Sequence, residues 1–371
     1  MKIVLVTGAE GFIGKNLCAM LERDEQIELL RVTRESSPEE LEKRVITADF
    51  IFHLAGVNRP DNDTEFEVHN HQLTDTIIQH LKNGNKTTPV LITSSSQAEL
   101  DNPYGKSKKA AEDALLAWSK ESSSPVYIYR LPGVFGKWSK PNYNSVVATF
   151  CHNIVHDIDI TISDPEKMIS LVYIDDVVNE FINILYEAKE ENATRFCEVN
   201  PVFEISLSDL ASRLKYIKET REKLIVPNFE EALDRNLYAT FTSYFEQSDI
   251  AYPLDKKEDD RGWLAEFIKS EQFGQIYISR TNPGFTRGVH WHNTKIEKFL
   301  VFEGEAEIKL RQLHSDIVET YQVSGKELRV MEMPAGYVHS IKNIGDTDMF
   351  LLIWSQQVFD PDHPDTYFQE V

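Results

Sequence analysis

Side chains able to exchange a proton with a ketone lie close together between Thr93 and Lys108. Tyr104 and Lys108 are four residues apart, so on a helix they share one face. A free tyrosine, with a pKa near ~10, exchanges protons poorly at neutral pH, but a nearby ammonium favours the phenolate and lowers that pKa. A hydroxyl from the run Ser94-Ser95-Ser96 could hold the substrate oxygen. Together these groups predict reduction of a ketone or its reverse, although ordinary helix surfaces also produce the tyrosine–lysine spacing.

A second set of residues has the spacing of a metal site. His290 and His292 are two residues apart, so on a strand their side chains point to one face. Glu297 follows on the next turn or strand, and His339 comes later, after Pro334-Ala335-Gly336. A lone histidine is usually a core residue, but three imidazoles and one carboxylate suit a divalent transition ion such as zinc. The spacing predicts a metal site with room for water or substrate.

The N-terminal residues predict the element that would hold a dinucleotide. A β-branched run, Lys2 to Thr7, leads into three glycines and then an amphipathic helix. Such glycines permit a tight turn and close approach of a pyrophosphate to the helix N-terminus. A later buried strand also ends against the cofactor, with His53 more simply interpreted as a packed histidine. The expected cofactor contacts are Thr7, Gly8, Gly11, Phe12, Ile13, Gly14, Leu54, Ala55 and Gly56.

The residue after the second predicted strand bears on which dinucleotide is used. NAD-preferring sites usually place a carboxylate there for the ribose hydroxyls. This chain has Arg34 instead, which favours a 2′-phosphate and therefore NADPH. The alternative is a solvated loop arginine.

Composition narrows the class of protein. The chain has 371 residues, enough for two domains, and a net charge of -21, which disfavours nucleic acid as a partner. Its three widely spaced cysteines suit free thiols in a reducing compartment. We expect no signal peptide, no membrane span and a cytoplasmic location.

Several motifs occur in the order typical of one enzyme family. They are the glycine turn, His53-Leu54-Ala55-Gly56, the serine run, Tyr104 with Lys108, the Pro132 turn, and Val172-Tyr173-Ile174-Asp175-Asp176-Val177. Residues 1–245 thus resemble an extended short-chain dehydrogenase/reductase (SDR) acting on nucleotide sugars, an α/β Rossmann-like fold. The resemblance implies that Ser95 is the catalytic serine and that Lys108 also binds the nicotinamide ribose.

Gly133 replaces the usual asparagine, which affects a backbone or sugar contact. Asn144 could contact the sugar or, equally, cap the next helix together with Ser145.

The C-terminal part has a different pattern. Residues 246–256 break the helical pattern and form the expected linker, and short strands dominate residues 257–371. The histidine and glutamate spacings resemble both motifs of the cupin, an all-β jelly-roll barrel. A further likeness to deoxysugar-nucleotide epimerases implies that Arg261 and Arg287 bind the diphosphate, unless they only form surface ion pairs. It also implies that the matching histidine and lysine, His290 and Lys298, remove the proton beside the ketone. Because His290 also fits a metal ligand, Lys298 or polarisation of the ketone by the metal could take part of that role.

Over its full length the chain resembles bifunctional capsular polysaccharide synthesis enzymes of the CapF type. This resemblance implies C3 epimerisation of a UDP-2-acetamido-2,6-dideoxy-4-hexulose by the cupin, then NADPH reduction of the C4 ketone, on the route to UDP-N-acetyl-L-fucosamine. Barrels of this kind commonly pair through edge strands, so we expect a homodimer. Two other interpretations remain. One is a single-function reductase whose zinc cupin serves only dimerisation, and the other is a nucleotide sensor built on an inactive reductase.

Overall fold

The computed structural model describes residues 1–58, 66–187 and 194–371, which form two compact units. The first comprises Met1–Lys215 and Arg235–Phe245, and the second comprises Tyr216–Asp234 and Glu246–Val371. The second unit therefore includes a segment that lies within the range 1–245 expected for the first domain.

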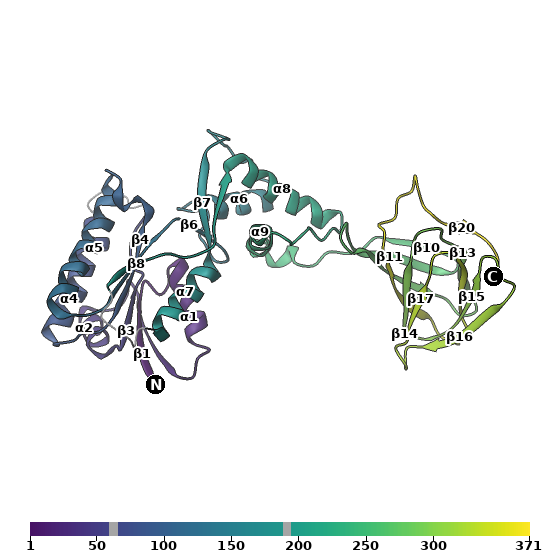
Figure 1. Cartoon of the computed structure of the whole chain (residues 1–371), viewed down its shortest axis with the longest axis horizontal. Helices are drawn as coiled ribbons and strands as arrows, with labels where there is room; N and C mark the ends of the chain where they lie inside the picture. The colour runs from purple at the N-terminus through teal and green to yellow at the C-terminus, as the bar shows by residue number, and fades with distance from the viewer. Residues whose placement is uncertain (59–65, 188–193) are drawn as a thin grey trace. The chain divides into compact units, whose positions relative to one another are not determined.

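The first unit contains a six-stranded parallel sheet in the order β2-β1-β3-β4-β5-β8 (Figure 1). Because successive side chains of a strand face opposite sides, Val4 and Val6 of β1 pack with α1 and α7, whereas Leu5 packs with α2, α4 and α5. A sheet buried on both faces explains the continuous apolar runs of these strands. The strands are β1 (Lys2–Thr7), β2 (Ile27–Val32), β3 (Phe50–His53), β4 (Val90–Ser95), β5 (Val126–Leu131) and β8 (Arg195–Cys197). The covering helices are α1 (Phe12–Leu21), α2 (Pro38–Thr47), α4 (Leu73–Asn83), α5 (Pro103–Ser122) and α7 (Ile174–Glu187). The predicted Rossmann-like α/β class is confirmed.

Smaller elements complete this part of the chain. A π-helical turn, η1 (Glu67–Gln72), precedes α4, and a 3-10 turn, η2 (Ser96–Glu99), links β4 to α5. A separate three-stranded sheet is formed by β6 (Gly133–Phe135), β7 (Met168–Tyr173) and β9 (Val202–Ser206). The remaining helices are α6 (Val146–Val155), α8 (Leu207–Glu222) and α9 (Ala232–Thr242).

The second unit contains two antiparallel sheets. Their orders are β10-β11-β12-β19-β14-β17 and β16-β15-β18-β13-β20. Apolar side chains from both sheets form one core, which includes Phe299 and Val301 of β14 and Ile308 of β15. The strands are β10 (Lys256–Asp259), β11 (Gly262–Ser270), β12 (Gly274–Thr281), β13 (Thr286–Trp291), β14 (Glu297–Glu303), β15 (Glu305–Gln312), β16 (Val318–Ser324), β17 (Val330–Met333), β18 (Tyr337–Asn343), β19 (Met349–Ser355) and β20 (Tyr367–Phe368). The predicted all-β cupin class is confirmed.

The segment Tyr216–Asp234 is joined to the second unit by backbone hydrogen bonds. The Val226 amide donates to the Lys269 carbonyl of β11, and the Lys269 amide donates to the Leu224 carbonyl, both at 2.8 Å. A 3-10 turn, η3 (Gln247–Asp249), follows α9.

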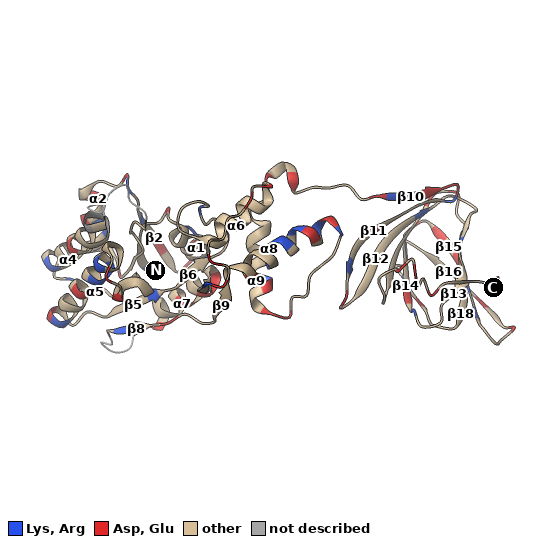
Figure 2. Cartoon of the chain, turned by 90° about the horizontal axis from the view of Figure 1, so that it is seen from above, with Lys and Arg blue, Asp and Glu red and all other residues tan. Residues whose placement is uncertain are grey.

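Surface charge is mixed. Figure 2 shows acidic and basic residues intermixed along α4 and α5. Among the described residues, no helix is both long enough and apolar enough to cross a bilayer.

Candidate functional sites

The turn between β1 and α1 has the close contacts of a phosphate-binding turn. Gly8 has φ +67°, and a Cβ there would lie 2.7 Å from the Ala55 amide nitrogen. A Cβ on Gly14 would lie 2.1 Å from the Gly8 carbonyl oxygen. Gly11 precedes α1, whose first turn has no acidic residue and no side-chain cap. The free amides and positive dipole end of α1 therefore fit a diphosphate.

The other predicted cofactor residues surround this turn. The Gly8 amide donates to the Val32 carbonyl at 3.0 Å, so the end of β2 lies beside it. Arg34 follows β2, is exposed and has no ion-pair partner among the described residues. The side chains of Phe12, Ile13 and Leu54 are half-buried and pack against the core.

His53 is a structural residue with a definite tautomer. Thr74 donates to the Asn70 carbonyl at 2.8 Å, so its oxygen accepts the proton of His53 Nε2 at 2.9 Å. Nδ1 then accepts from the Thr7 hydroxyl at 2.8 Å, and that oxygen accepts from the Ala55 amide at 3.2 Å. Burial, together with Lys108, lowers the pKa of His53 to about 3, so the ring is neutral. This neutral ring fixes the end of β3 against the glycine turn.

The start of α5 determines where Tyr104 lies. Asn102 caps the helix by accepting from the Gly105 amide at 2.7 Å, and Pro103 occupies the first turn. A Cβ on Gly105 would lie 2.2 Å from the Gln97 carbonyl oxygen. Only glycine therefore allows this turn of α5 to approach η2 so closely.

Tyr104, Ser95 and Lys108 are brought together in the first unit. Lys108 Nζ lies 6.0 Å from the centre of the Tyr104 ring and donates to the Thr93 carbonyl at 3.1 Å. Burial raises the pKa of Tyr104, and a hydrogen bond with Ser95 lowers it by less. The lowering expected from Lys108 is not found, since the pKa of Tyr104 is raised overall. Burial lowers the pKa of Lys108 itself to about 8, and its ammonium donates to the Thr93 carbonyl.

The two neighbouring serines differ in availability. Ser94 donates to the buried carboxylate of Glu112 at 2.5 Å, whereas Ser95 accepts from the Gln97 amide at 3.1 Å and contacts Tyr104. Ser96 begins η2 and is exposed. The geometry therefore favours Ser95 as the residue that contacts substrate.

Asn70 is a positioning residue that sequence reasoning missed. Its side chain accepts from the Val57 amide at 2.8 Å and donates to Ser107 Oγ at 3.0 Å. Ser107 in turn donates to the Tyr104 carbonyl at 2.8 Å. Asn70 thus joins the loop after β3 to the first turn of α5, which carries Tyr104, and nothing in its local sequence indicates this role.

The loop before α6 shows whether Asn144 caps that helix or is free to contact a sugar. Ser145 caps α6 by accepting from the Ala148 amide at 3.2 Å, whereas Asn144 is exposed and does not cap the helix. The neighbouring Tyr143 acts on Tyr104, contributing to the raised pKa of that residue. This loop therefore lies close to Tyr104.

In the second unit, His290, His292, Glu297 and His339 form one cluster. Their ligand atoms all lie within 4.8 Å of one another, and His290 pairs with His339 across β13 and β18. His292 Nε2 and His339 Nε2 are buried, have no hydrogen-bond partner among the described residues, and lie 3.4 and 3.7 Å from Glu297 Oε2. Unpartnered imidazole nitrogens beside a carboxylate fit a divalent metal ion.

Outer contacts orient these groups. His292 Nδ1 donates to the Asp365 carbonyl at 2.6 Å, and His339 Nδ1 donates to the Tyr337 carbonyl at 3.3 Å. Tyr277 donates to Glu297 Oε1 at 2.7 Å. Burial raises the pKa of Glu297, but His292 and Tyr277 outweigh it and lower that pKa overall, keeping the carboxylate ionised. Burial and the neighbouring rings lower the pKa of His290 to about 3, so this ring is neutral.

Lys298 is not part of this cluster, contrary to expectation. Successive residues of a strand face opposite sides, and Glu297 is buried while Lys298 is exposed. Lys298 Nζ instead pairs with Glu332 at 2.5 Å. It is therefore not positioned to remove a proton beside the metal ligands.

Arg261 and Arg287 share one carboxylate. Arg261 pairs with Asp259 at 2.5 Å and Arg287 pairs with it at 3.3 Å. Arg287 is largely buried, its Nε has no hydrogen-bond partner among the described residues, and burial lowers its pKa. The role of Arg287 is therefore not limited to a surface ion pair, because its buried Nε–H group can still donate a hydrogen bond.

Comparison with known proteins identifies the family of each part of the chain. Residues 4–196 match the NAD dependent epimerase/dehydratase family, and residues 257–367 match the polysaccharide biosynthesis C-terminal domain. A UDP-2-acetamido-2,6-beta-L-arabino-hexul-4-ose reductase from Pseudomonas aeruginosa is 43% identical over 98% of this chain and 97% of its own. The chain belongs to the NAD dependent epimerase/dehydratase family. Membership implies a nicotinamide cofactor.

Solved structures support the same conclusion. The capsular polysaccharide assembling protein CapF from Staphylococcus aureus is 43% identical, covers 100% of both chains and has a TM-score of 0.92. The resemblance to enzymes of the CapF type is therefore confirmed. UDP-glucuronic acid 4-epimerase from Bacillus cereus, solved with NAD, is 18% identical over 65% of this chain and 98% of its own, with a TM-score of 0.56, and shows the shared fold alone.

Proposed function

We propose that the chain is a bifunctional nucleotide-sugar enzyme of capsular polysaccharide biosynthesis. The cupin, residues 257–371, epimerises C3 of a UDP-2-acetamido-2,6-dideoxy-4-hexulose. The reductase, residues 1–245, then reduces the C4 ketone with NADPH to UDP-2-acetamido-2,6-dideoxy-L-talose, on the route to UDP-N-acetyl-L-fucosamine. The carrying observation is that one chain contains both the Tyr104–Ser95–Lys108 site and the cluster of three histidines and Glu297.

In the reduction, Tyr104 gives a proton to the ketone oxygen. A bound NADPH would supply the hydride for the carbon. Ser95 holds the carbonyl oxygen beside the phenol. Lys108 binds the nicotinamide ribose and keeps a positive charge near the reacting groups. Arg34 is exposed next to the end of β2, where it would bind the 2′-phosphate of NADPH. Asn144 is exposed and available to contact the sugar.

Chemistry determines the order of the two steps. The C3 hydrogen is acidic only while C4 is a ketone, so epimerisation precedes reduction. A divalent ion, which we propose to be zinc, would supply polarisation of that ketone when bound. Arg287, with a buried free donor, supports binding of the diphosphate, and exposed Arg261 is available beside it.

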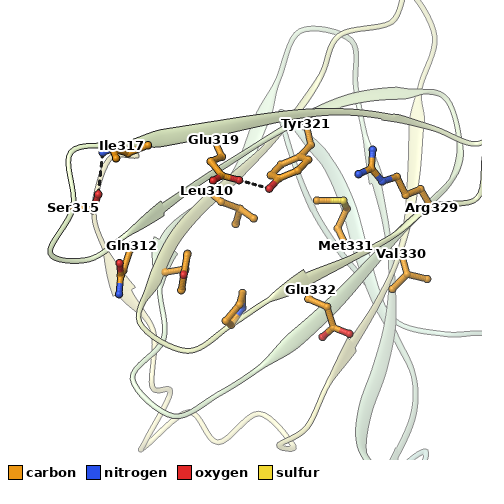
Figure 3. A pocket seen from close by; sticks show the side chains of 12 residues that line it. Leu310, Gln312, Ser315, Ile317, Glu319, Tyr321, Arg329, Val330, Met331 and Glu332 are labelled. Atoms are coloured by element: carbon orange, nitrogen blue, oxygen red, sulfur yellow. Dashed lines mark hydrogen bonds between the residues drawn. The ribbon is translucent and has the colours of Figure 1, made fainter.

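We further propose a cytoplasmic homodimer that associates through the cupin. Among the described strands, β16 and β17 each end a sheet and so have one unpaired edge. Ile317 and Val330 are 73% and 53% exposed beside these edges, at a cavity of about 540 Å³ whose lining includes Leu310 and Met331 (Figure 3). Exposed apolar edges favour association. The double variant Ile317→Lys/Val330→Lys should be monomeric by light scattering, and an unchanged mass would contradict this interface.

The test of bifunctionality uses the full chain, because the second compact unit includes Tyr216–Asp234. The UDP-linked 4-keto-6-deoxy-N-acetylhexosamine is incubated in D2O, with C3 deuterium followed by mass spectrometry and NADPH by absorbance. Tyr104→Phe should retain exchange and lose at least ~100-fold in NADPH oxidation. Glu297→Gln should lose exchange. NADPH oxidation without C3 deuterium in the unsubstituted chain would leave a single-function reductase with a structural cupin.

A further inference from the structure

The C-terminal segment, residues 364–368, contributes none of the four ligands but contacts the strand that carries His290 and the turn that begins with His292. In β20, Phe368 pairs with His290 and Tyr367 pairs with Trp291. The Tyr367 ring also stacks on Trp291 with centres 4.7 Å apart. This segment therefore covers the outer edge of the ligand strand β13.

Asp365 closes the turn that connects ligands His292 and Glu297. Its carboxylate accepts from three successive amides, those of Asn293 at 3.0 Å and of Thr294 and Lys295 at 2.9 Å. It also accepts from the Thr294 hydroxyl at 2.9 Å. Asp365 has φ +42°, a conformation that aspartate and asparagine tolerate better than most residues. One side chain thus determines the path of the chain between two ligands.

The backbone of Asp365 also determines the tautomer of His292. Its carbonyl oxygen can only accept, so the proton of the ring lies on Nδ1, 2.6 Å away. Nε2 then presents a lone pair, and this atom is buried, unpartnered among the described residues and 3.4 Å from Glu297 Oε2. A partner that holds a histidine in this way typically changes metal affinity when it is lost.

We propose that Asp365 is a positioning residue of the metal centre, and that residues 364–368 support His292 from outside the ligand set. This inference rests on the proposed metal site. Losing such an outer partner typically costs about 10–100-fold in metal affinity. If the segment serves only the stability of the barrel, its loss should lower thermal stability and leave zinc affinity unchanged.

The experiment measures zinc affinity of the full metal-stripped chain by competition with a chromophoric chelator. Asp365→Ala keeps the backbone carbonyl that accepts from His292 but loses the carboxylate that holds the turn against it, so zinc binding should weaken toward the lower end of that range, about 10-fold. Asp365→Asn, which keeps an acceptor oxygen and tolerates the positive φ, should lose less. The matched control is Asp360→Ala, four residues before this segment. Among the described residues its carboxylate bonds only to Asp362 and His363, so the affinity should stay unchanged.

Each outcome has a distinct meaning. Unchanged affinity in Asp365→Ala overturns the positioning role, and if that variant does not fold, unchanged affinity in Asp365→Asn does so instead. An equal loss in Asp360→Ala also overturns it, since the effect would then not be specific to Asp365. No zinc binding by the unsubstituted chain overturns the metal site itself.

Discussion

Replacing Glu112 with glutamine should shift the pH dependence of ketone reduction. Glu112 is fully buried on α5, where it accepts from Ser94 and from Arg130 Nε and Nη2 at 3.0 and 2.7 Å. It also lies one helical turn after Lys108 and raises the pKa of that lysine, against burial, which lowers the pKa to about 8. Removing the negative charge should therefore lower the pKa of Lys108 further.

The size of the shift follows from Coulomb's law. Two charges ~6 Å apart at an effective dielectric constant of ~20 interact by about 2.8 kcal/mol. Because the Arg130 guanidinium is bound to the same carboxylate, we halve this to about 1.4 kcal/mol, which is about one pKa unit. For the unsubstituted enzyme, kcat/KM should fall with a midpoint near pH 8 as Lys108 loses its charge. For Glu112→Gln the midpoint should move to about pH 7.

Glu99→Gln is the matched control, because Glu99 contacts the same guanidinium from an exposed position. It should leave the midpoint unchanged and cost under ~1 kcal/mol of unfolding free energy. Glu112→Gln should cost about 2 kcal/mol, below the usual range for a broken buried pair because Arg130 keeps Glu99 as a partner. The same midpoint in the Glu112 variant and the unsubstituted enzyme would refute the proposed coupling to Lys108.

Three further substitutions test the geometry of the two sites. Gly105→Ala should abolish reduction and lower the melting temperature, because the new Cβ would lie 2.2 Å from the Gln97 carbonyl; normal activity would contradict this packing. Asn102→Ala should reduce the unfolding free energy in a urea titration by about 1 kcal/mol through loss of the helix cap. An unchanged unfolding free energy would show that Asn102 does not stabilise the helix. Tyr277→Phe should weaken zinc binding about 10-fold by freeing the carboxylate of Glu297, and chelator competition showing equal affinity would exclude that role.

The sequence was enough to place candidate site residues together where they lie close to one another in the chain. Tyr104 and Lys108 lie on one helix, and His290 and His292 lie on or beside one strand, so local periodicity already places each pair together. The structure places Lys298 on the opposite side of β14 from Glu297, and strand periodicity would have predicted this once both residues were placed on one strand.

Other features depend on contacts between distant parts of the chain. Asp365 and His292 form a hydrogen bond although they are 73 residues apart in the sequence, and Asn70 and Ser107 do so although they are 37 residues apart. No spacing rule connects such residues. The direction of the Tyr104 pKa also required the structure, because burial raises it and the lowering by Lys108 that the sequence suggested is not found.

The division of the chain between its two units limits how such proteins can be recombined. The chain passes between units at Lys215–Tyr216, at Asp234–Arg235 and at Phe245–Glu246. A gene fusion with a single junction within residues 246–256 would encode the barrel without residues 216–234. In that barrel Lys269 would lack its backbone hydrogen-bond partners Leu224 and Val226. Exchange of the complete second unit between genes would therefore require the coding sequence for residues 216–234 as well as that for residues 246–371.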